Sequence, residues 1–173
     1  MTMRSMDELG EMKLDSKLGA LYIVADEREL RGIYWRGRIG TGSAPSPRTN
    51  RILSRAARQL EEYLAGKRKE FDLPIRFGGT PFQTLVWAEL RRIPYGCTIS
   101  YRELAARVGS PNAFRAAGTA NGKNPLSIII PCHRVIAADG SLGGYAGGLP
   151  NKSALLRLEE INSIPFAPAP KKR

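Results

Sequence analysis

The sequence contains few of the residues that build metal sites or disulfide frameworks. Among 173 residues there are two cysteines and one histidine. Two cysteines cannot form a disulfide framework, and one histidine with two cysteines cannot complete a tetrahedral zinc site without carboxylates. We therefore expect no bound metal, and a reducing, cytoplasmic environment in which a thiol stays free.

Long apolar stretches are absent as well. No run of about 18 apolar residues occurs, so we expect no membrane-spanning helix and no membrane partner. The opening residues, MTMRSMDELGEM, lack the apolar core of a secretory signal. Both observations favour a cytoplasmic protein.

Acidic residues are scarce relative to basic ones. The chain has 27 lysines and arginines against 16 aspartates and glutamates, which gives a formal net charge of +11. A protein this basic is attracted to polyanions, with nucleic acid the first candidate and an anionic membrane the second. Only three of these charges lie at the end of the chain, on residues 171–173. The charge therefore indicates a nucleic-acid partner and not merely a basic tail.

The first part of the chain predicts a small α/β domain, which we place over residues 1–79. Two strands are expected over residues 17–35, and apolar residues at helical spacing predict a helix over residues 46–67. A third, short strand is expected over residues 71–77, before a pair of glycines. Nothing in this part of the sequence indicates a reaction site.

The second part of the chain opens with three predicted helices. Thr80, followed by proline, is a typical N-cap for the first helix. Ser100 and Glu103 predict a capping box for the second helix, and Ser110 is expected to cap the third. The second and third helices have the spacing of a helix-turn-helix. The third, AFRAAGTAN, has mostly small side chains and one long cation, Arg115, which suits either close approach of its backbone to a duplex or a tight helix crossing.

The stretch IIIPCHRV brings the only histidine next to one of the cysteines. Residues 128–130 predict a buried strand that ends at Pro131 and presents Cys132 to a pocket. A neighbouring base makes a thiol nucleophilic, and His133 is the candidate base, with Glu159 available to orient its imidazole. The alternative is that the cysteine is a small buried hydrophobe and the histidine a satisfied surface residue.

The motifs PCHRV, GGYAGG and LLRLE, in this order, resemble the active-site region of the O-6-alkylguanine-DNA alkyltransferases, also called methylated-DNA–protein-cysteine methyltransferases. The preceding segments GTPFQTLVWAELRRIPYG, SYRELAARVG and FRAAGTANGKNP follow the pattern of the same family. The likeness is to the constitutive bacterial type and is strong over the second half of the chain. The first half agrees with the family only in length and in the layout of its elements.

The resemblance implies two domains. An α/β, ribonuclease-H-like domain with a small mixed sheet and a helix would span residues 1–79. A mainly α, winged helix-turn-helix domain that docks on the minor groove would span residues 80–165, and a basic, proline-rich tail would follow over residues 166–173.

The resemblance also implies direct-reversal DNA repair. The alkyl group of O-6-alkylguanine would move irreversibly to the protein's own cysteine, after the nucleotide has been flipped out of the duplex. DNA is then the donor, each molecule acts once, and no cofactor is expected. The expected partner is double-stranded DNA carrying the lesion, bound by a monomer; the sequence leaves open whether binding is cooperative and whether O-4-alkylthymine is a substrate.

Individual roles follow from the positions that match the family. The implied catalytic residues are the acceptor Cys132 with His133, Glu159, Asn124 and Tyr101. The implied DNA contacts are Arg115, Tyr101, Ala113, Ala116, Gly118 and Thr119. The implied base pocket consists of Val135, Tyr145 and Ala146. The family often has serine where Ala146 stands, so a hydroxyl contact to the guanine oxygen is missing here and only the backbone N–H remains. Arg134 is expected to be structural and to tie its loop to a carboxylate.

Two other functions compete with this hypothesis. A non-catalytic lesion sensor would share the scaffold, but such proteins replace the acceptor cysteine, which this chain retains. A Cys-His hydrolase would need an oxyanion hole and an acyl-binding cleft, and it would leave the positive charge and the helix-turn-helix pattern unexplained.

Overall fold

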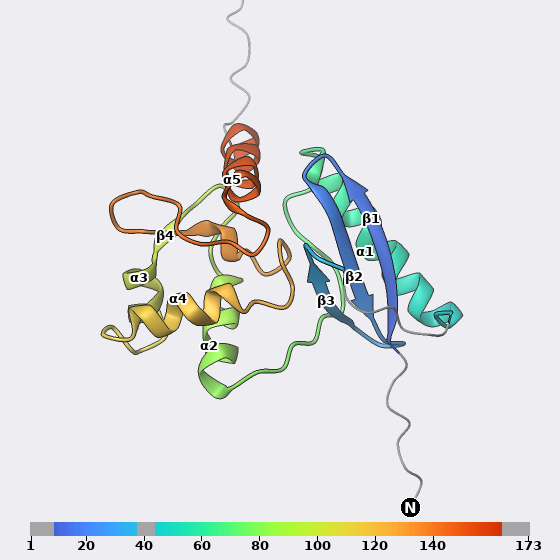
Figure 1. Ribbon diagram of the computed structural model, residues 1–173, viewed down its shortest axis with the longest axis horizontal. Helices are drawn as coiled ribbons and strands as arrows, with labels where there is room; N and C mark the ends of the chain where they lie inside the picture. Colours follow the sequence, from blue (N-terminus) through green and yellow to red (C-terminus); the bar gives the residue numbers. More distant parts are fainter. Residues whose placement is uncertain (1–8, 38–43, 164–173) are drawn as a thin grey trace, which may run out of the picture.

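The computed structural model describes residues 9–37 and 44–163, and Figure 1 shows them as two groups of elements lying side by side. A three-stranded sheet and helix α1 form the first group, and helices α2 to α5 form most of the second. The tail predicted over residues 166–173 lies outside the described residues. Across the described ranges, no helix is long and apolar enough to cross a membrane.

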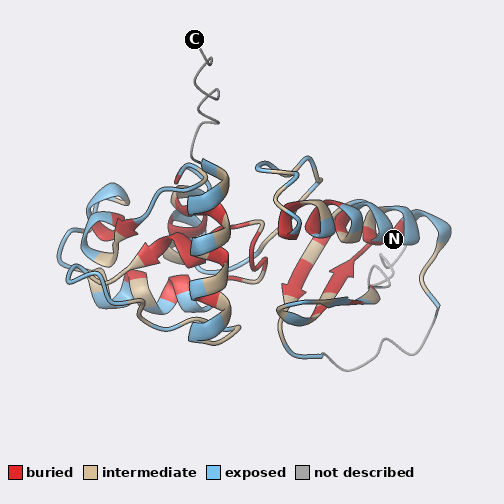
Figure 2. Ribbon diagram, turned by 90° about the horizontal axis from the view of Figure 1, so that it is seen from above, coloured by how far each residue is buried: buried red, intermediate tan, exposed pale blue. Residues whose placement is uncertain are grey.

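The first group is built on an antiparallel sheet in the order β1-β2-β3. Its strands are Gly10–Ser16, Gly19–Ala25 and Leu30–Tyr34. In the first part of β2, the fully buried Leu21 and Ile23 alternate with half-buried residues, as expected of a strand with one face in the core, and the strand ends in the buried Val24 and Ala25. Helix α1 covers this face of the sheet, as Figure 2 shows.

Helix α1, Pro47–Leu64, follows directly from its sequence. The hydroxyl of Ser46 accepts a hydrogen bond from a backbone N–H of the first turn, at 3.2 Å, and proline occupies the first helical position. Apolar residues such as Leu53 and Leu60 recur at helical spacing and are fully buried. After the helix the chain turns at Gly66, whose φ of 74° lies in the left-handed region that glycine adopts at little cost.

The strand predictions were only partly right. Strands β2 and β3 were predicted, but β1 was missed because its segment, GEMKLDS, offers only two apolar residues among polar ones. The strand predicted over residues 71–77 is wrong: a single parallel bridge joins Ile75 to Leu30, since the neighbouring Pro74 has no N–H to donate to a ladder. The sheet is antiparallel and not mixed, apart from such isolated parallel bridges.

The second group is mainly helical. Its helices are α2 (Pro81–Leu90), α3 (Tyr101–Arg107), α4 (Phe114–Gly122) and α5 (Leu149–Ser163). Two short strands, β4 (Ile99–Ser100) and β5 (Val135–Ile136), pair in parallel. Helices α2, α3 and α4 pack against one another, and the indole Nε1 of Trp87 donates to the carbonyl of Ala120 at 2.8 Å, which fixes α2 on α4.

The predicted helix starts at residues 80 and 100 are confirmed. Thr80 and Gln83 form a full capping box at α2. At α3, the hydroxyl of Ser100 accepts from the backbone N–H of Glu103 at 3.1 Å. The carboxylate of Glu103 pairs instead with Arg107, one turn further along the helix, so the predicted capping box is present only in half.

The predicted start of the third helix is wrong. Helix α4 begins at Phe114, after Ala113, and no side chain caps it. The intervening Pro111 and Asn112 form a turn, which is closed by a hydrogen bond from the N–H of Ala113 to the carbonyl of Ser110. Ser110 therefore starts a turn, a position that favours serine for the same reason as an N-cap does.

The strand predicted over residues 128–130 is also wrong, although two of the three isoleucines are buried. Ile128 has a φ of 74° and lies in a tight turn, in which the N–H of Ile130 donates to the carbonyl of Leu126 at 2.9 Å. Cys132 opens a short 3-10 helix, Cys132–Arg134, and does not stand at the end of a strand. Burial and β-branching are shared by core strands and by buried turns, so the pattern could not distinguish them.

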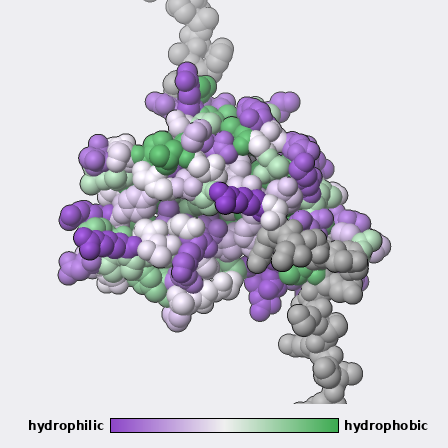
Figure 3. Space-filling view, viewed as in Figure 1, coloured by the Kyte–Doolittle hydropathy of each residue, from purple (hydrophilic) through white to green (hydrophobic). Residues whose placement is uncertain are grey.

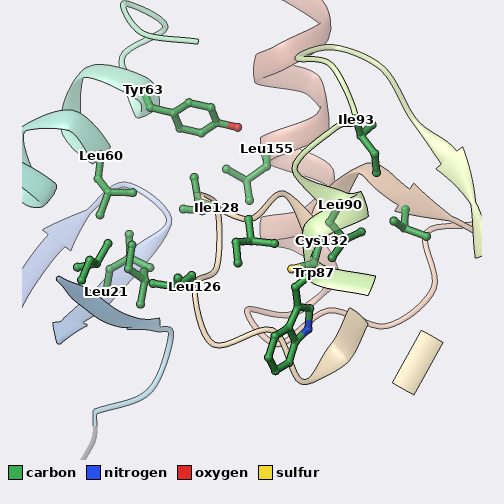
Figure 4. Packing of buried hydrophobic residues seen from close by; sticks show 14 of the residues in the cluster. Leu21, Leu60, Tyr63, Trp87, Leu90, Ile93, Leu126, Ile128, Cys132 and Leu155 are labelled. Atoms are coloured by element: carbon green, nitrogen blue, oxygen red, sulfur yellow. The ribbon is translucent and has the colours of Figure 1, made fainter. Parts of the chain in front are cut away.

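A continuous core joins the two groups. Figure 4 shows the buried side chains of Leu21 and Leu60 from the first group close to those of Leu126, Ile128 and Leu155 from the second. The main chain connects them too, because residues 125–127 form two backbone hydrogen bonds with β3, of 2.9 and 3.3 Å. The sheet and α1 are therefore held firmly against the turn that carries Cys132.

Helix α2 offers a matched test of this packing, because it carries one buried and one exposed leucine. Leu90 is fully buried and Leu85 is 56% exposed. We expect Leu90→Ala to lower the free energy of unfolding by about 2–5 kcal/mol, and Leu85→Ala to change it by less than about 0.5 kcal/mol. Urea denaturation of both variants measures the difference; equal losses would contradict the packing described here.

Candidate active site around Cys132

Backbone hydrogen bonds hold Cys132 rigidly at the start of its 3-10 helix. Its N–H donates to the carbonyl of Ile130 at 2.8 Å, and its carbonyl accepts from the side-chain amide of Asn121 at 3.3 Å. Asn124 stabilises the preceding turn with two hydrogen bonds: its Nδ2 donates to the carbonyl of Ile130 at 2.7 Å, and its Oδ1 accepts from the N–H of Leu126 at 3.0 Å. The cysteine side chain is thus placed by two asparagines, of which the sequence analysis identified only Asn124.

The thiol of Cys132 is protonated at rest. Burial raises its pKa, while a hydrogen bond from Asn124 and the positive charge of Lys152 act in the opposite direction without outweighing it. Only 4% of the residue is exposed to solvent. Reaction at this sulfur therefore requires a nearby base that removes the proton.

His133 is placed to be that base. Its imidazole is completely buried, and its Nε2 lies 2.8 Å from Oε1 of Glu159. Within the described part of the chain, Nδ1 of the same ring is buried without a hydrogen-bond partner. Because the carboxylate accepts the Nε2 hydrogen, the lone pair of Nδ1 is left free in the neutral ring. Burial also lowers the pKa of His133, against the opposing effect of Glu159, which keeps the imidazole neutral and able to accept a proton.

Glu159 collects hydrogen bonds from several parts of the chain. Besides His133, Arg134 donates to it from Nε at 2.9 Å and from Nη2 at 2.8 Å, and the backbone N–H of Gly96 donates at 3.0 Å. Burial by itself would raise the pKa of Glu159, but the hydrogen bonds from His133 and Arg134 outweigh it and hold the pKa far below its usual range. The carboxylate therefore stays ionised, and Arg134 is bound to a carboxylate as predicted.

The first part of the chain, in whose sequence nothing indicates a reaction site, contributes one residue to this cluster. Tyr63, near the end of α1, is fully buried and its hydroxyl donates to Oε1 of Glu159 at 2.5 Å. The same hydroxyl lies 3.3 Å from Nε2 of His133. In the sequence, Tyr63 occupies one of the apolar positions of a helix, which is typical of a core residue. No neighbouring residue indicates that its hydroxyl also binds a buried carboxylate.

Lys152 is a second residue that the sequence analysis missed. Its side chain is completely buried, and its Nζ donates to the carbonyl of Val135 at 2.6 Å and to the hydroxyl of Tyr101 at 3.4 Å. Burial lowers its pKa to about 8, against a smaller opposing effect of Cys132. The spacing of residues 152 and 159 along one face of α5 was the available signal, since both are charged residues at buried helical positions.

A groove of about 580 Å³ opens beside this cluster, between α4 and the glycine-rich loop. Its lining residues are Tyr101, Phe114, Arg115, Gly118, Thr119, Gly122, Gly143, Gly144, Tyr145 and Ala146. Small residues keep it open: a Cβ added to Gly143 would come within 2.6 Å of the hydroxyl of Tyr101. Strongly hydrophilic side chains project over α3 and α4 at the edge of this part of the molecule, as Figure 3 shows.

The structure brings about half of the predicted site residues to the lining of this groove, while Cys132, His133, Glu159 and Asn124 lie outside that lining. Of the predicted DNA contacts, Arg115, Gly118 and Thr119 line it, Ala116 is exposed on the same helix, and Ala113 immediately precedes that helix. Of the predicted base pocket, Tyr145 and Ala146 line it, whereas Val135 is buried on β5 and is not part of the lining. Within residues 9–37 and 44–163, no cluster of three or more histidine, cysteine or acidic side chains is arranged to hold a metal ion.

Two family models match the chain in succession. Residues 11–77 match the ribonuclease-like domain of 6-O-methylguanine DNA methyltransferase, and residues 81–161 match its DNA-binding domain. A ribonuclease-like domain followed by a DNA-binding domain is the architecture that the sequence resemblance implied.

Comparison with individual proteins gives the same answer. The chain is 44% identical over 151 residues to a protein of Methanosarcina barkeri named methylated-DNA–protein-cysteine methyltransferase, covering 86% of this chain and 96% of that protein. It is 43% identical over 154 residues to the constitutive methylated-DNA–protein-cysteine methyltransferase of Bacillus subtilis, covering 86% and 93%. A Mycobacterium tuberculosis relative, solved in complex with DNA, is 43% identical, with a TM-score of 0.80 over 92% of this chain and 96% of that one. The protein therefore belongs to the methylated-DNA–protein-cysteine methyltransferase family.

Proposed function

We propose that Cys132 is the residue that accepts the alkyl group from O-6-alkylguanine in double-stranded DNA, in a direct reversal of the damage. The observation that carries this proposal is the arrangement of His133, which is fixed to Glu159 through Nε2 while its Nδ1 has no partner in the described residues. In such a histidine the ring is held in place by Glu159, and the lone pair of Nδ1 remains able to accept a proton. Membership of the methyltransferase family supplies the reaction for which this base is needed.

The chemistry is a single displacement at the alkyl carbon. The proton of the Cys132 thiol passes through a water molecule to Nδ1 of His133, and Glu159 stabilises the imidazolium that forms. The sulfur then bonds to the alkyl carbon, the bond from that carbon to O6 breaks, and its electron pair returns to the guanine, which takes up one proton. The product is a neutral thioether, which has no easy leaving group. One molecule of protein therefore repairs one base.

The buried position of the sulfur requires the base to leave the duplex. With only 4% of Cys132 exposed, no atom of a stacked base pair can reach it. The groove between α4 and the loop over residues 143–146 is lined by Tyr101 and Tyr145 and is large enough for a purine. In this arrangement Val135, Tyr145 and Ala146 form the wall of the base pocket.

Helices α3 and α4 are suited to act as a helix-turn-helix within a winged domain. Gly118 and the alanines of α4 let its backbone approach the duplex closely, with few side chains to read base edges. Arg115 is exposed on α4, with its guanidinium carbon 5.9 Å from the centre of the Phe114 ring. We assign Arg115 to the gap that the flipped nucleotide leaves, and Ala113, Ala116 and Thr119 to the surrounding backbone contacts. A monomer suffices for this mode of binding.

Lys152 supports the reaction electrostatically. Its buried ammonium is within reach of Tyr101 and adds positive charge next to the sulfur, which favours the thiolate. Tyr101 thereby belongs both to the groove and to the environment of the acceptor.

The proposal predicts a change in mass at one cysteine. On incubation with a duplex that contains O-6-methylguanine, the protein should gain a single methyl group on Cys132, as measured by intact mass and peptide mapping. Cys132→Ala should bind the duplex and gain nothing. The matched control is Cys97→Ala, because Cys97 is exposed and lies outside the cluster, so this variant should be methylated like the unmodified protein.

Three other outcomes would contradict the proposal. Methylation of Cys97 would show that Cys132 is not the acceptor. Binding to the lesion without any gain in mass would favour a lesion sensor. Neither binding nor methylation would favour a different activity, such as that of a hydrolase.

A second prediction concerns Arg115. Arg115→Ala should slow transfer from O-6-methylguanine in a duplex at least about tenfold, since the cost of extruding the nucleotide is no longer offset, and should leave transfer from a free O-6-alkylguanine base nearly unchanged. Single-turnover rates with both substrates give the comparison. The control is Arg157→Ala, which removes an exposed arginine from α5. Equal losses on the two substrates would contradict the role of Arg115 in base flipping.

A further inference from the structure

We propose that Tyr63, from the N-terminal domain, is a positioning residue that keeps His133 neutral through a shared oxygen of Glu159. This inference rests on the proposed function only in giving the histidine its task as a base. The arrangement of the three side chains is independent of it.

Tyr63 and His133 meet at one atom. Oε1 of Glu159 accepts from the hydroxyl of Tyr63 at 2.5 Å and from Nε2 of His133 at 2.8 Å. All three side chains are at least 99% buried, so water cannot replace either donor. The two donors therefore compete for the negative charge of the same oxygen.

The ring of Tyr63 is held so that its hydroxyl cannot swing away. Phe71 packs against it with ring centres 5.3 Å apart, and Tyr95 meets it edge-on at 6.0 Å. Burial and the charge of Glu159 raise the pKa of the Tyr63 hydroxyl well above its usual range, so it stays protonated and can only donate to the carboxylate. The hydroxyl therefore remains a donor at neutral pH and below.

A permanent donor on Oε1 weakens the attraction of Glu159 for a charged histidine. A carboxylate whose charge is already bound by hydrogen bonds stabilises a neighbouring imidazolium less. The groups that face His133 from the surrounding elements are Tyr63 on α1, Glu159 and Lys152 on α5, and Cys132 and Arg134 in its own turn. Burial disfavours the charged ring, as do Arg134 and Lys152, while Glu159 favours it. By weakening the effect of Glu159, the hydroxyl of Tyr63 would act in the same direction as the two cations.

The arrangement gives the N-terminal domain a part in the reaction. Tyr63 is carried by α1, whereas His133 and Glu159 belong to the DNA-binding domain. Any displacement of α1 relative to α5 would lengthen the bond from Tyr63 to Glu159 and make the histidine harder to keep neutral.

The chain offers a matched pair of variants to test this. Tyr63→Phe removes only the hydroxyl that binds Glu159. Tyr95→Phe removes a neighbouring hydroxyl that has no hydrogen-bond partner in the described residues, from a ring that packs against Tyr63. Because His133 is the only histidine of the chain, its pKa can be followed by NMR as a single imidazole signal.

We expect Tyr63→Phe to raise the pKa of His133 by about 0.5–1 unit, and Tyr95→Phe to leave it unchanged. Since the reaction needs neutral His133, the rate of alkyl transfer falls as the pH drops through this pKa. The acid limb of the rate profile should therefore move to higher pH by the same amount in Tyr63→Phe, while the final extent of methylation stays complete.

An unchanged pKa in Tyr63→Phe, or a rate lowered equally at every pH, would overturn the inference and leave a packing role. Should the phenylalanine variant not fold, 3-fluorotyrosine at position 63 provides the opposite change: its more acidic hydroxyl is a stronger donor and should lower the pKa of His133, and an increase or no change would overturn the inference. The NMR titration needs no substrate, so a failure of the proposed function, seen as no methyl transfer by the unmodified protein, is distinguished from a failure of this inference.

Discussion

The buried carboxylate of Glu159 is the interaction on which the site depends. It accepts hydrogen bonds from His133, Arg134, Gly96 and Tyr63, which come from three separate segments of the chain. An ionised carboxylate taken out of water is costly unless donors satisfy it, and removing one partner of such a cluster is strongly destabilising. The same bonds that satisfy the charge also fix the imidazole of His133, the residue next to the proposed acceptor Cys132. Stability and chemistry are therefore coupled at this residue.

Because of this coupling, both domains contribute residues to the cluster around Glu159. The DNA-binding domain contains Cys132, His133 and the groove, to which we assign the reaction, while the ribonuclease-like domain contributes α1 and the aromatic side chain of Tyr63 to the same cluster. A continuous apolar core and backbone hydrogen bonds between β3 and residues 125–127 hold the two together. The N-terminal domain thus acts as a rigid support, which a preorganised base requires.

The sequence predicted what depends on neighbouring residues. The Thr80-Pro pair marked the start of α2, and the PCHRV motif drew attention to the turn that carries the proposed acceptor Cys132, because both signals are local. Prediction from the sequence failed where contacts between residues far apart in the chain determine the local structure. A serine before a proline is equally suited to a turn and to a helix cap, so the start of α4 was misplaced. Ile128 adopts a left-handed turn, which a β-branched residue does not favour, and Tyr63 cannot be told from an ordinary core residue of a helix without the partners that surround it. Lys152 could be noticed only by its spacing from Glu159 along α5, and that spacing does not reveal its contacts.

The central claim is that Glu159 fixes one tautomer of His133, with the hydrogen on Nε2 and a free lone pair on Nδ1. Long-range ¹H–¹⁵N correlation of the single imidazole, in the full chain at neutral pH, measures this directly. The account predicts the chemical shift of a protonated nitrogen at Nε2 and of an unprotonated one at Nδ1. A hydrogen on Nδ1, a doubly protonated ring, or rapid averaging between the two tautomers would contradict it.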